Sequence, residues 1–395
     1  MSSEPCLSPD LLRWLSSQPH RGSGTEEELQ AARRLEWWLT EHGHRVESVP
    51  LRAPTDTLLR GPAAVMGVMA LGLVAGHFLP WALALTWLAV VPLWGELAGA
   101  PLNLDVLLPR HSSQTLFATV ESAPLEGPRI LLSAHYDTQR ASLLFEPGRE
   151  RRLRTVFALA YTAMGLALVV SLLATVLGPV AAVVAAQAAV AALLVGTGGW
   201  LLASGRGRPF VNGAGDNGSG VALLLAVAER LRRRPLAGVN LCLALTGAEE
   251  VGERGMAALL RERDRALGPE RTVVVNLDNL GAGRLQDLGG EGQLLPYPYD
   301  PMLRSTLAAT LERLGMPAPA RDGRLLLPTD ALPALWRGYR AITLLCMDPH
   351  GRIPHYHWPT DTLAAVDMAQ LGRLEEVVEA YVRDVARRLT AEDRA

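Results

Sequence analysis

The chain has 395 residues, of which 49% are hydrophobic and 20% charged, so it is long enough for one large domain or two ordinary ones. Its 38 basic residues, all arginine, nearly balance 40 acidic residues, and the net charge of −2 gives no electrostatic reason to expect nucleic-acid binding. Three widely separated cysteines indicate neither a disulfide framework nor a cysteine zinc site. The N-terminus lacks the basic start and apolar run of a signal peptide.

The first part of the chain predicts helices, one strand and an apolar block. Residues 8–43 carry apolar side chains at helical spacing and end in a glycine, and a strand-like segment follows at 44–53. Residues 61–95 contain no formally charged residue and predict two short apolar helices with "HFLP" as the turn. Each would be near the lower limit of about 17 residues for a membrane span.

A second apolar block is the strongest membrane signal in the chain. It follows strands expected at 114–122 and 128–135, and it runs for 51 residues, 155–205, without Asp, Glu, Lys or Arg. The sequence "LGP" at 177–179 divides the block into two segments of roughly 20 residues, the length that crosses a bilayer core of about 30 Å. The alternative is a buried helical hairpin in a soluble core or a dimer interface.

From residue 206 onward, apolar strand-like runs alternate with amphipathic helices. This alternation predicts a layered α/β domain with a mixed, largely parallel, twisted central sheet. Five short motifs place metal-binding side chains just after such strands or in tight loops. They are "SAHYDT" (133–138), "GAGDNGSG" (213–220), "LTGAEEVG" (245–252), "VVVNLDNLG" (273–281) and "PHYHWPTDT" (354–362).

In an open α/β sheet these strand ends converge on one crevice, where they would bring together two histidines and several carboxylates. Two histidines and three carboxylates are the minimum set with which two zinc ions can share one bridging carboxylate. Asp216 suits the bridge because its loop is rich in glycine. Asp137 is placed to orient His135. Of the adjacent Glu249 and Glu250, one can bind metal while the other serves as general base.

Each motif alone is more often structural than functional, but the five together, in order, resemble the clan MH dizinc exopeptidases. This family of bacterial aminopeptidases has relatives among glutaminyl cyclases and transferrin-receptor-like proteins. The resemblance covers about 8–55, 113–140 and 206–390, which leaves out the two apolar blocks. It implies that His135 and Asp278 hold one zinc, that Glu250 and His357 hold the other, and that Asp216 bridges the two.

The resemblance also implies a three-layer α/β/α fold and an aminopeptidase or dipeptidase activity on peptides with a free N-terminus. A hydroxide bridging two Zn²⁺ ions would attack the first peptide bond, with Glu249 as general base and Tyr356 stabilising the oxyanion. Cobalt or manganese could replace zinc. The segment "LPTDALPALWRGY" departs from the family pattern, because Ala331 follows Asp330 where relatives often carry histidine.

His135 and Asp216 are 81 positions apart, with the second apolar block between them. If both bind the same metal pair, the chain must leave and re-enter on the same side, so the crossings are even in number. We therefore expect a single zinc-peptidase domain, 1–395, with inserted transmembrane hairpins at 61–98 and 155–205. Arginines flank the blocks on the domain side, which by the positive-inside rule predicts a multi-pass protein of the bacterial inner membrane with a cytoplasmic catalytic domain.

Two other functions remain open from the sequence. One is a glutaminyl-cyclase-like aminoacyl transfer on the same fold. The other is a non-catalytic receptor or scaffold, although such relatives usually lose metal ligands and none of the five is missing here.

Overall fold

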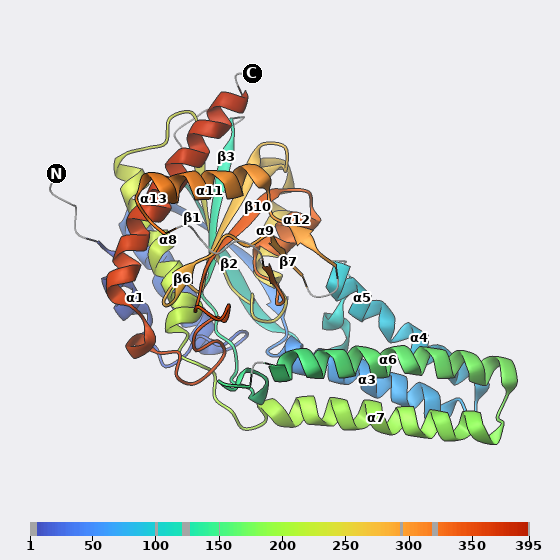
Figure 1. The fold of residues 1–395 in the computed structure, drawn as a ribbon. Helices are drawn as coiled ribbons and strands as arrows, with labels where there is room; N and C mark the ends of the chain where they lie inside the picture. Colours follow the sequence, from blue (N-terminus) through green and yellow to red (C-terminus); the bar gives the residue numbers. More distant parts are fainter. Residues whose placement is uncertain are drawn as a thin grey trace. The chain divides into compact units, whose positions relative to one another are not determined.

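Two compact units make up the chain in the computed structural model, which describes residues 6–98, 102–120, 127–149, 151–292, 295–317 and 323–393 (Figure 1). The first unit comprises Met1–Thr55, His111–Gln139 and Phe210–Ala395. The second comprises Asp56–Arg110 and Arg140–Pro209, and it contains both apolar blocks.

A seven-stranded mixed sheet forms the centre of the first unit, in the order β1-β2-β4-β3-β5-β10-β6. The four strands β4, β3, β5 and β10 are parallel, whereas β1, β2 and β6 run antiparallel to their neighbours. This confirms the expected mixed, largely parallel sheet. The strands are β1 (Arg45–Ala53), β2 (His111–Val120), β3 (Arg129–His135), β4 (Asn240–Thr246), β5 (Thr272–Asp278), β6 (Arg284–Leu285) and β10 (Arg340–Met347). Residues 121 and 122, expected in the second strand, lie outside the described residues.

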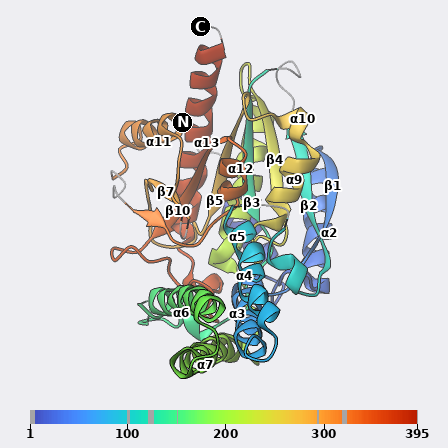
Figure 2. The same cartoon turned by 90° about the vertical axis from the view of Figure 1, so that its right-hand side faces the viewer.

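Helices cover both faces of the sheet, which explains why every residue of β3, β4 and β5 is buried (Figure 2). Helix α8 packs on β3 and β5 with α1 and α13 beside it, while α9 and α12 pack together on the other face. The helices are α1 (Ser8–Leu15), α2 (Glu26–Glu41), α8 (Ser219–Arg233), α9 (Arg254–Glu262), α10 (Asp264–Leu267), α11 (Pro301–Arg313), α12 (Ala331–Trp336) and α13 (Met368–Asp393). A small sheet pairs β7 (Gly290–Glu291) with β8 (Tyr297–Pro298) and β9 (Arg324–Leu325).

The second unit is helical and is built from both insertions. The first insertion contains α3 (Thr57–Ala75), a 3₁₀ turn (Pro80–Leu83), α4 (Ala84–Leu88), α5 (Val90–Ala98) and a second 3₁₀ turn (Leu104–Leu107). The second insertion contains a 3₁₀ turn (Leu143–Phe145), α6 (Arg151–Leu177) and α7 (Ala181–Gly205). Helices α3 and α6 therefore begin before the ranges 61–98 and 155–205 that the sequence marks, because charged residues occupy their first turns.

The helices of the two insertions share one core, in which α3 packs against both α6 and α7. The amide nitrogen of Gln187 on α7 donates to the carbonyl of Leu73 on α3, at 3.2 Å. Ser171 on α6 donates to the carbonyl of Leu83, at 3.4 Å. Two segments that are far apart in the sequence thus form one helical unit.

The outer surface of this helical unit is apolar. Of the 25 large hydrophobic side chains that are exposed among the described residues, 22 belong to it, including Phe78 (76% exposed), Val176 (72%) and Trp81 (70%). Four of its segments are long and apolar enough to cross a membrane: Leu58–Ala75, Pro80–Leu97, Arg151–Leu177 and Ala181–Gly205. The second of these is broken into three short helices.

Candidate metal centre

Three parallel strands end at the same edge of the sheet and deliver side chains to one place. His135 is the last residue of β3 and pairs in register with Thr246, the last residue of β4. The turn after β4 carries Glu249 and Glu250, and Asp278 is the last residue of β5. The convergence expected from the motifs is therefore present in the fold.

Asp216 reaches the same place from the loop before α8. It lies in the tight turn Ala214–Gly218, where Asp216 and Asn217 have non-helical backbone dihedrals, and it is 2% exposed. The loop turns at Gly213, whose φ of +68° is readily adopted only by glycine. Asp361 fixes the turn, because its carboxylate accepts hydrogen bonds from the backbone N–H groups of Gly215 (2.6 Å) and Asp216 (3.0 Å).

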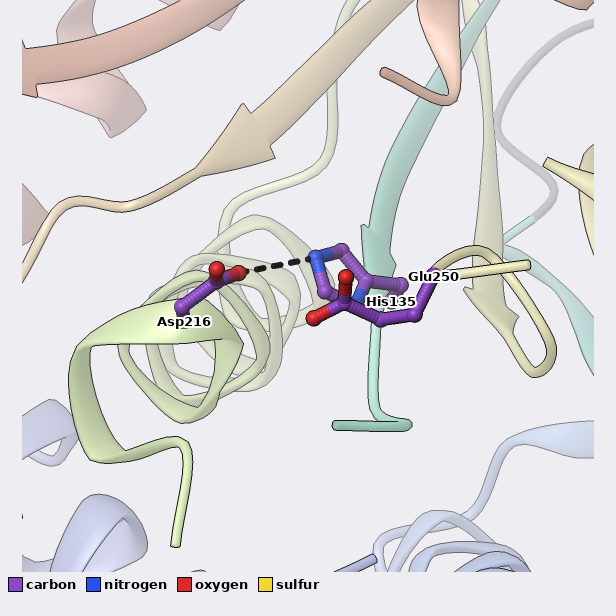
Figure 3. Close-up of side chains that lie close together, drawn as sticks. All are labelled: His135, Asp216 and Glu250. Carbon is purple, nitrogen blue, oxygen red and sulfur yellow. Dashed lines mark ion pairs between the residues drawn. The ribbon is translucent and has the colours of Figure 1, made fainter. Parts of the chain in front are cut away.

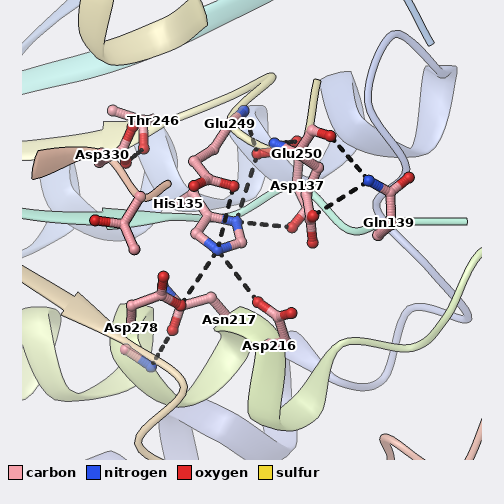
Figure 4. Close-up of polar contacts among 12 residues, drawn as sticks. His135, Asp137, Gln139, Asp216, Asn217, Thr246, Glu249, Glu250, Asp278 and Asp330 are labelled. Atoms are coloured by element: carbon pink, nitrogen blue, oxygen red, sulfur yellow. Dashed lines mark hydrogen bonds and ion pairs between the residues drawn. The ribbon is translucent and has the colours of Figure 1, made fainter. Parts of the chain in front are cut away.

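One group of candidate metal ligands surrounds His135 (Figure 4). Its Nε2 lies 3.3 Å from Oδ1 of Asp216, 3.5 Å from Oδ1 of Asp278 and 3.8 Å from Oε2 of Glu249. The imidazole and all three carboxylates are buried.

A second group forms around His357, which the loop after β10 supplies. Its Nε2 lies 3.1 Å from Oδ2 of Asp216 and 2.9 Å from Oε2 of Glu250. The two oxygens of Asp216 therefore face different histidines. Glu250 also lies close to His135, and donor atoms of His135, Asp216 and Glu250 fall within 4.8 Å of one another (Figure 3).

These distances fit divalent metal ions. Ligands about 2.0–2.1 Å from a tetrahedral zinc lie about 3.3 Å from one another, close to the separations around both histidines. One oxygen of Asp216 faces the group around His135 and the other faces the group around His357, so this carboxylate is placed to bridge two ions. Oε1 of Glu250 is buried and, within the described residues, accepts no hydrogen bond, as expected of an oxygen that can bind a cation.

The electrostatics of the cluster also favour a cation. Burial raises the pKa of Glu249 well above its usual value, and burial with the charge of Asp216 raises the pKa of Glu250 to about 7. Burial alone would lower the pKa of His357, but Glu250 and Asp216 raise it to about 10. So many buried carboxylates cannot all ionise beside two histidines at low cost, and divalent cations would offset their repulsion.

Asp137 forms hydrogen bonds that hold the turn carrying Glu249 and Glu250. Its carboxylate accepts the backbone N–H groups of Glu249 (3.0 Å) and Glu250 (3.2 Å) and the hydroxyl of Ser23 (2.5 Å). Nδ1 of His135 lies 3.2 Å from the carbonyl oxygen of Asp137 and 3.6 Å from its carboxylate. Asp137 therefore orders the Glu249–Glu250 turn in addition to lying beside His135, and its expected role of orienting that imidazole stays a prediction.

Backbone strain marks several residues of the site. Ala248, Asn279 and His357 all have φ between 50° and 52°, a conformation that costs a non-glycine residue about 1 kcal/mol or more. The first two adjoin Glu249 and Asp278, and the third is itself a candidate ligand. Each must be held by its surroundings, which is typical of functional loops.

Tyr356 is half-buried, and its ring stacks on the imidazole of His357 with centroids 3.8 Å apart. It therefore lies beside one metal-ligand candidate, and its role at an oxyanion stays a prediction.

Buried charged residues to which the sequence analysis gave no role surround the ligands. Glu28 accepts the N–H of Ala248 (3.0 Å) and the hydroxyl of Ser113 (2.7 Å), and Asp330 accepts the hydroxyl of Thr246. Asp361 is visible in "PTDT", where an acid soon after a histidine could have suggested a role. Glu28 looks in the sequence like an ordinary acid in the first turn of a helix.

Comparisons with known proteins bear on the family and the fold of the chain. Residues 197–382 match the family model described as Peptidase family M28. No curated protein matches the chain in a sequence search.

Solved structures share the fold across almost the whole chain. A Zn-dependent exopeptidase from Parabacteroides distasonis is 12% identical, with 97% of this chain and 99% of that one covered and a TM-score of 0.56. A glutaminyl cyclase from Bacteroides thetaiotaomicron is 13% identical (96% and 99% covered, TM-score 0.58). An aminopeptidase from Aneurinibacillus sp. strain AM-1 is 16% identical (95% and 92% covered, TM-score 0.54). The resemblance to dizinc aminopeptidases and glutaminyl cyclases is thus confirmed: the chain has their fold, and residues 197–382 carry the sequence pattern of peptidase family M28.

Proposed function

We propose that this protein is a membrane-anchored, zinc-dependent exopeptidase that removes residues from the N-terminus of peptides. The observation that carries the proposal is the position of Asp216, with one carboxylate oxygen 3.3 Å from His135 and the other 3.1 Å from His357. Asp278 and Glu250 complete the two groups. A scaffold without catalysis would have no need to keep this buried, strained and mutually repulsive set.

Two zinc ions fit these residues, with His135 and Asp278 at one ion, Glu250 and His357 at the other, and Asp216 between them. When bound, zinc polarises a scissile carbonyl and lowers the pKa of water. Glu249 remains for proton transfer: it accepts the proton of the attacking water and delivers it to the leaving amine. Burial raises the pKa of Glu249, which is the direction in which the pKa of a catalytic carboxylate is tuned for proton transfer near neutral pH.

The substrate class follows from the charge of the site. A protonated α-amino group is a cation, and Asp330, to which the proposal gives neither zinc binding nor proton transfer, is a buried acidic group close enough to Asp278 for the charge of Asp278 to affect its pKa. A free N-terminus would be attracted to this acidic environment, whereas an acetylated one would lose the attraction. The proposal therefore specifies peptides with free N-termini.

The variant Glu249→Gln tests the base. It preserves the shape of the side chain and removes proton transfer, so we expect hydrolysis of aminoacyl anilides to fall about 10²–10⁴-fold with zinc content unchanged. Glu262→Gln, an exposed change on α9, is the matched control. Near-full activity of Glu249→Gln would refute the base assignment, and a wild-type protein without zinc or turnover would refute the proposal.

Glutaminyl cyclase activity is a second candidate, because several of the similar solved structures are glutaminyl cyclases. The same acidic site could position an N-terminal glutamine for attack of its own amine on its side-chain amide. Peptides that begin with glutamine separate the two functions. Loss of ammonia with the peptide intact would select the cyclase, and release of free glutamine would select the peptidase.

Membrane anchoring is supported by the surface and length of the helices. At 1.5 Å per residue, the 27 residues of α6 span about 40 Å and the 25 residues of α7 about 38 Å, more than the roughly 30 Å of a hydrocarbon core. Their exposed faces carry Leu166, Val169, Leu172 and Val195, which suit lipid and would be costly in water.

The distribution of charge suggests an orientation for the anchor. Arginines lie at the start of α6 (Arg151, Arg152, Arg154) and just after α7 (Arg206, Arg208), while the turn between these helices has none. The positive-inside rule then places the catalytic unit in the cytoplasm of a bacterial cell. A reporter fused at residue 178 should lie outside the inner membrane and one at residue 395 inside. Both on one side would contradict the hairpin.

A further inference from the structure

The chain leaves the first unit between the two residues that must meet at the metal centre. It departs after Gln139 and returns at Phe210. His135 lies four residues before the departure, and Asp216 lies six residues after the return. The 70-residue excursion, 140–209, gives the chain no local means to fix the separation of these two side chains, so other contacts must fix it.

Arg21 makes those contacts. It is fully buried, one of the largest side chains so enclosed in the described structure. Its Nε donates to the carbonyl oxygen of Tyr136, at 2.6 Å, on the departing segment. Its two terminal nitrogens donate to the carbonyl oxygens of Asn212 (2.9 Å) and Gly213 (2.8 Å), on the returning segment. One guanidinium group therefore joins the two ends of the excursion.

The backbone around Arg21 strengthens this link. Its N–H donates to the hydroxyl of Thr138 at 3.1 Å, and the N–H of Thr138 donates to the carbonyl oxygen of Arg21 at 3.2 Å. The N–H of Val211 donates to the carbonyl oxygen of Gln139 at 2.9 Å, directly between the two ends. The side-chain amide of Asn212 donates to the carbonyl oxygen of Gln18, at 2.8 Å.

Only arginine suits this position. Its rigid planar fork carries five N–H donors that point in different directions, whereas a lysine ammonium is a single point on a flexible chain. Burial lowers the pKa of Arg21 to about 10, so the group stays charged at neutral pH. The nearby carboxylates Asp361, Asp137 and Asp216 balance that charge.

We propose that Arg21 is a positioning residue, which clamps the departing and returning ends of the 140–209 excursion and so sets the distance between His135 and Asp216. The clamp acts through Tyr136, which follows His135, and through Gly213, which begins the turn that presents Asp216. The consequence for the metal centre rests on the proposed zinc function. The clamp itself does not rest on that function: the two ends of the excursion should stay together without any metal.

Two variants of the full chain in detergent test the effect on metal binding. Arg21→Met removes the fork and the charge, and Arg21→Lys keeps the charge alone. Zinc affinity is measured by competition with a chelator, at a temperature where each variant retains the circular dichroism of the wild type. We expect both variants to bind zinc about 10–100-fold more weakly. The control is Arg13→Met, which removes an arginine that is 56% exposed.

A change in melting temperature alone, with wild-type zinc affinity in Arg21→Met, would show that Arg21 only stabilises the fold and would overturn the proposal. Wild-type affinity in Arg21→Lys would show that charge suffices and would overturn it too. The absorption spectrum of the cobalt-loaded protein adds an independent reading. The clamp predicts altered d–d bands in both variants, because the ligand geometry changes.

Hydrogen exchange in the unmodified protein tests the clamp without any variant. The N–H groups of Thr138 and Val211 should remain as protected as those of β3 after zinc is removed with a chelator. Rapid exchange of both after chelation would show that metal, and not Arg21, holds the ends together. If the wild type binds no zinc at all, the proposed function fails, while this exchange experiment still decides whether the clamp exists.

Discussion

Glu291 is a buried carboxyl group whose ionisation should make stability depend on pH. It lies on β7, fully buried, and accepts hydrogen bonds from the hydroxyls of Tyr299 (2.6 Å) and Thr329 (2.8 Å). Burial raises its pKa to about 8, and these hydrogen bonds offset only part of the cost. Glutamine has nearly the same shape and never ionises, so Glu291→Gln isolates the cost of the charge.

The sign and size of the effect follow from the two pKa values. In the unfolded chain the group ionises near pH 4.5, whereas the folded protein keeps its proton up to about pH 8. The stabilising contribution is therefore fully present below about pH 4.5 and is lost as the pH rises towards 8. Between these limits stability should fall by about 1.4 kcal/mol per pH unit, or about 3 kcal/mol from pH 5.5 to 7.5.

The measurement is the free energy of unfolding in urea at pH 5.5, 6.5 and 7.5, for wild type and Glu291→Gln, after divalent cations have been removed. The difference between them should grow with pH in favour of the variant. Glu312→Gln, an exposed change on α11, controls for charge removal as such. Parallel curves for wild type and Glu291→Gln would refute the argument that burial of this charge is costly.

Two further predictions concern the metal centre. Glu250→Gln should lose about half of the bound zinc by elemental analysis, because it weakens the group around His357, where Oε2 of Glu250 lies 2.9 Å from Nε2; retention of both ions would contradict the ligand assignment. Gly213→Ala should destabilise the protein by about 2–5 kcal/mol, since its Cβ would lie 2.3 Å from the methyl of Thr138 in addition to the strained φ. Gly207→Ala has a similar φ of +70° and open space, so it should cost only about 1–2 kcal/mol, and equal losses of stability would show that the close contact is unimportant.

The sheet and the ligand candidates could be predicted because their signals are local. A buried parallel strand is a continuous apolar run, and a polar residue at its end marks the edge where ligands bind. His135 and Asp278 each end such a strand. Glu249 and Glu250 follow β4 by a few residues, so the same rule about strand ends identified them as candidates.

Apart from the position of Asp137 beside His135, the contacts of the supporting residues could not be predicted, because the partners are distant in the sequence. Glu28 accepts the N–H of Ala248, 220 positions away, and Asp361 accepts the N–H of Asp216, 145 positions away. Neither contact leaves a periodic pattern in the chain. Arg21 was even harder to predict, because the local sequence around a buried arginine that donates to carbonyl groups does not differ from that around a solvated one.

Hydropathy likewise could not show that the two apolar blocks contact each other. Hydropathy treats each block separately, and the first is weaker, with a mean hydropathy of 1.2 over its broken second segment against 2.2 over an 18-residue window of α6. In the structure the second block supports the first: Gln187 on α7 and Ser171 on α6 donate to carbonyls of Leu73 and Leu83 in the first block. In lipid an unpaired backbone carbonyl costs several kcal/mol, so such contacts can hold helices too short or irregular to span alone. These contacts join the first block to the second, although β2 and β3 separate the two blocks along the chain.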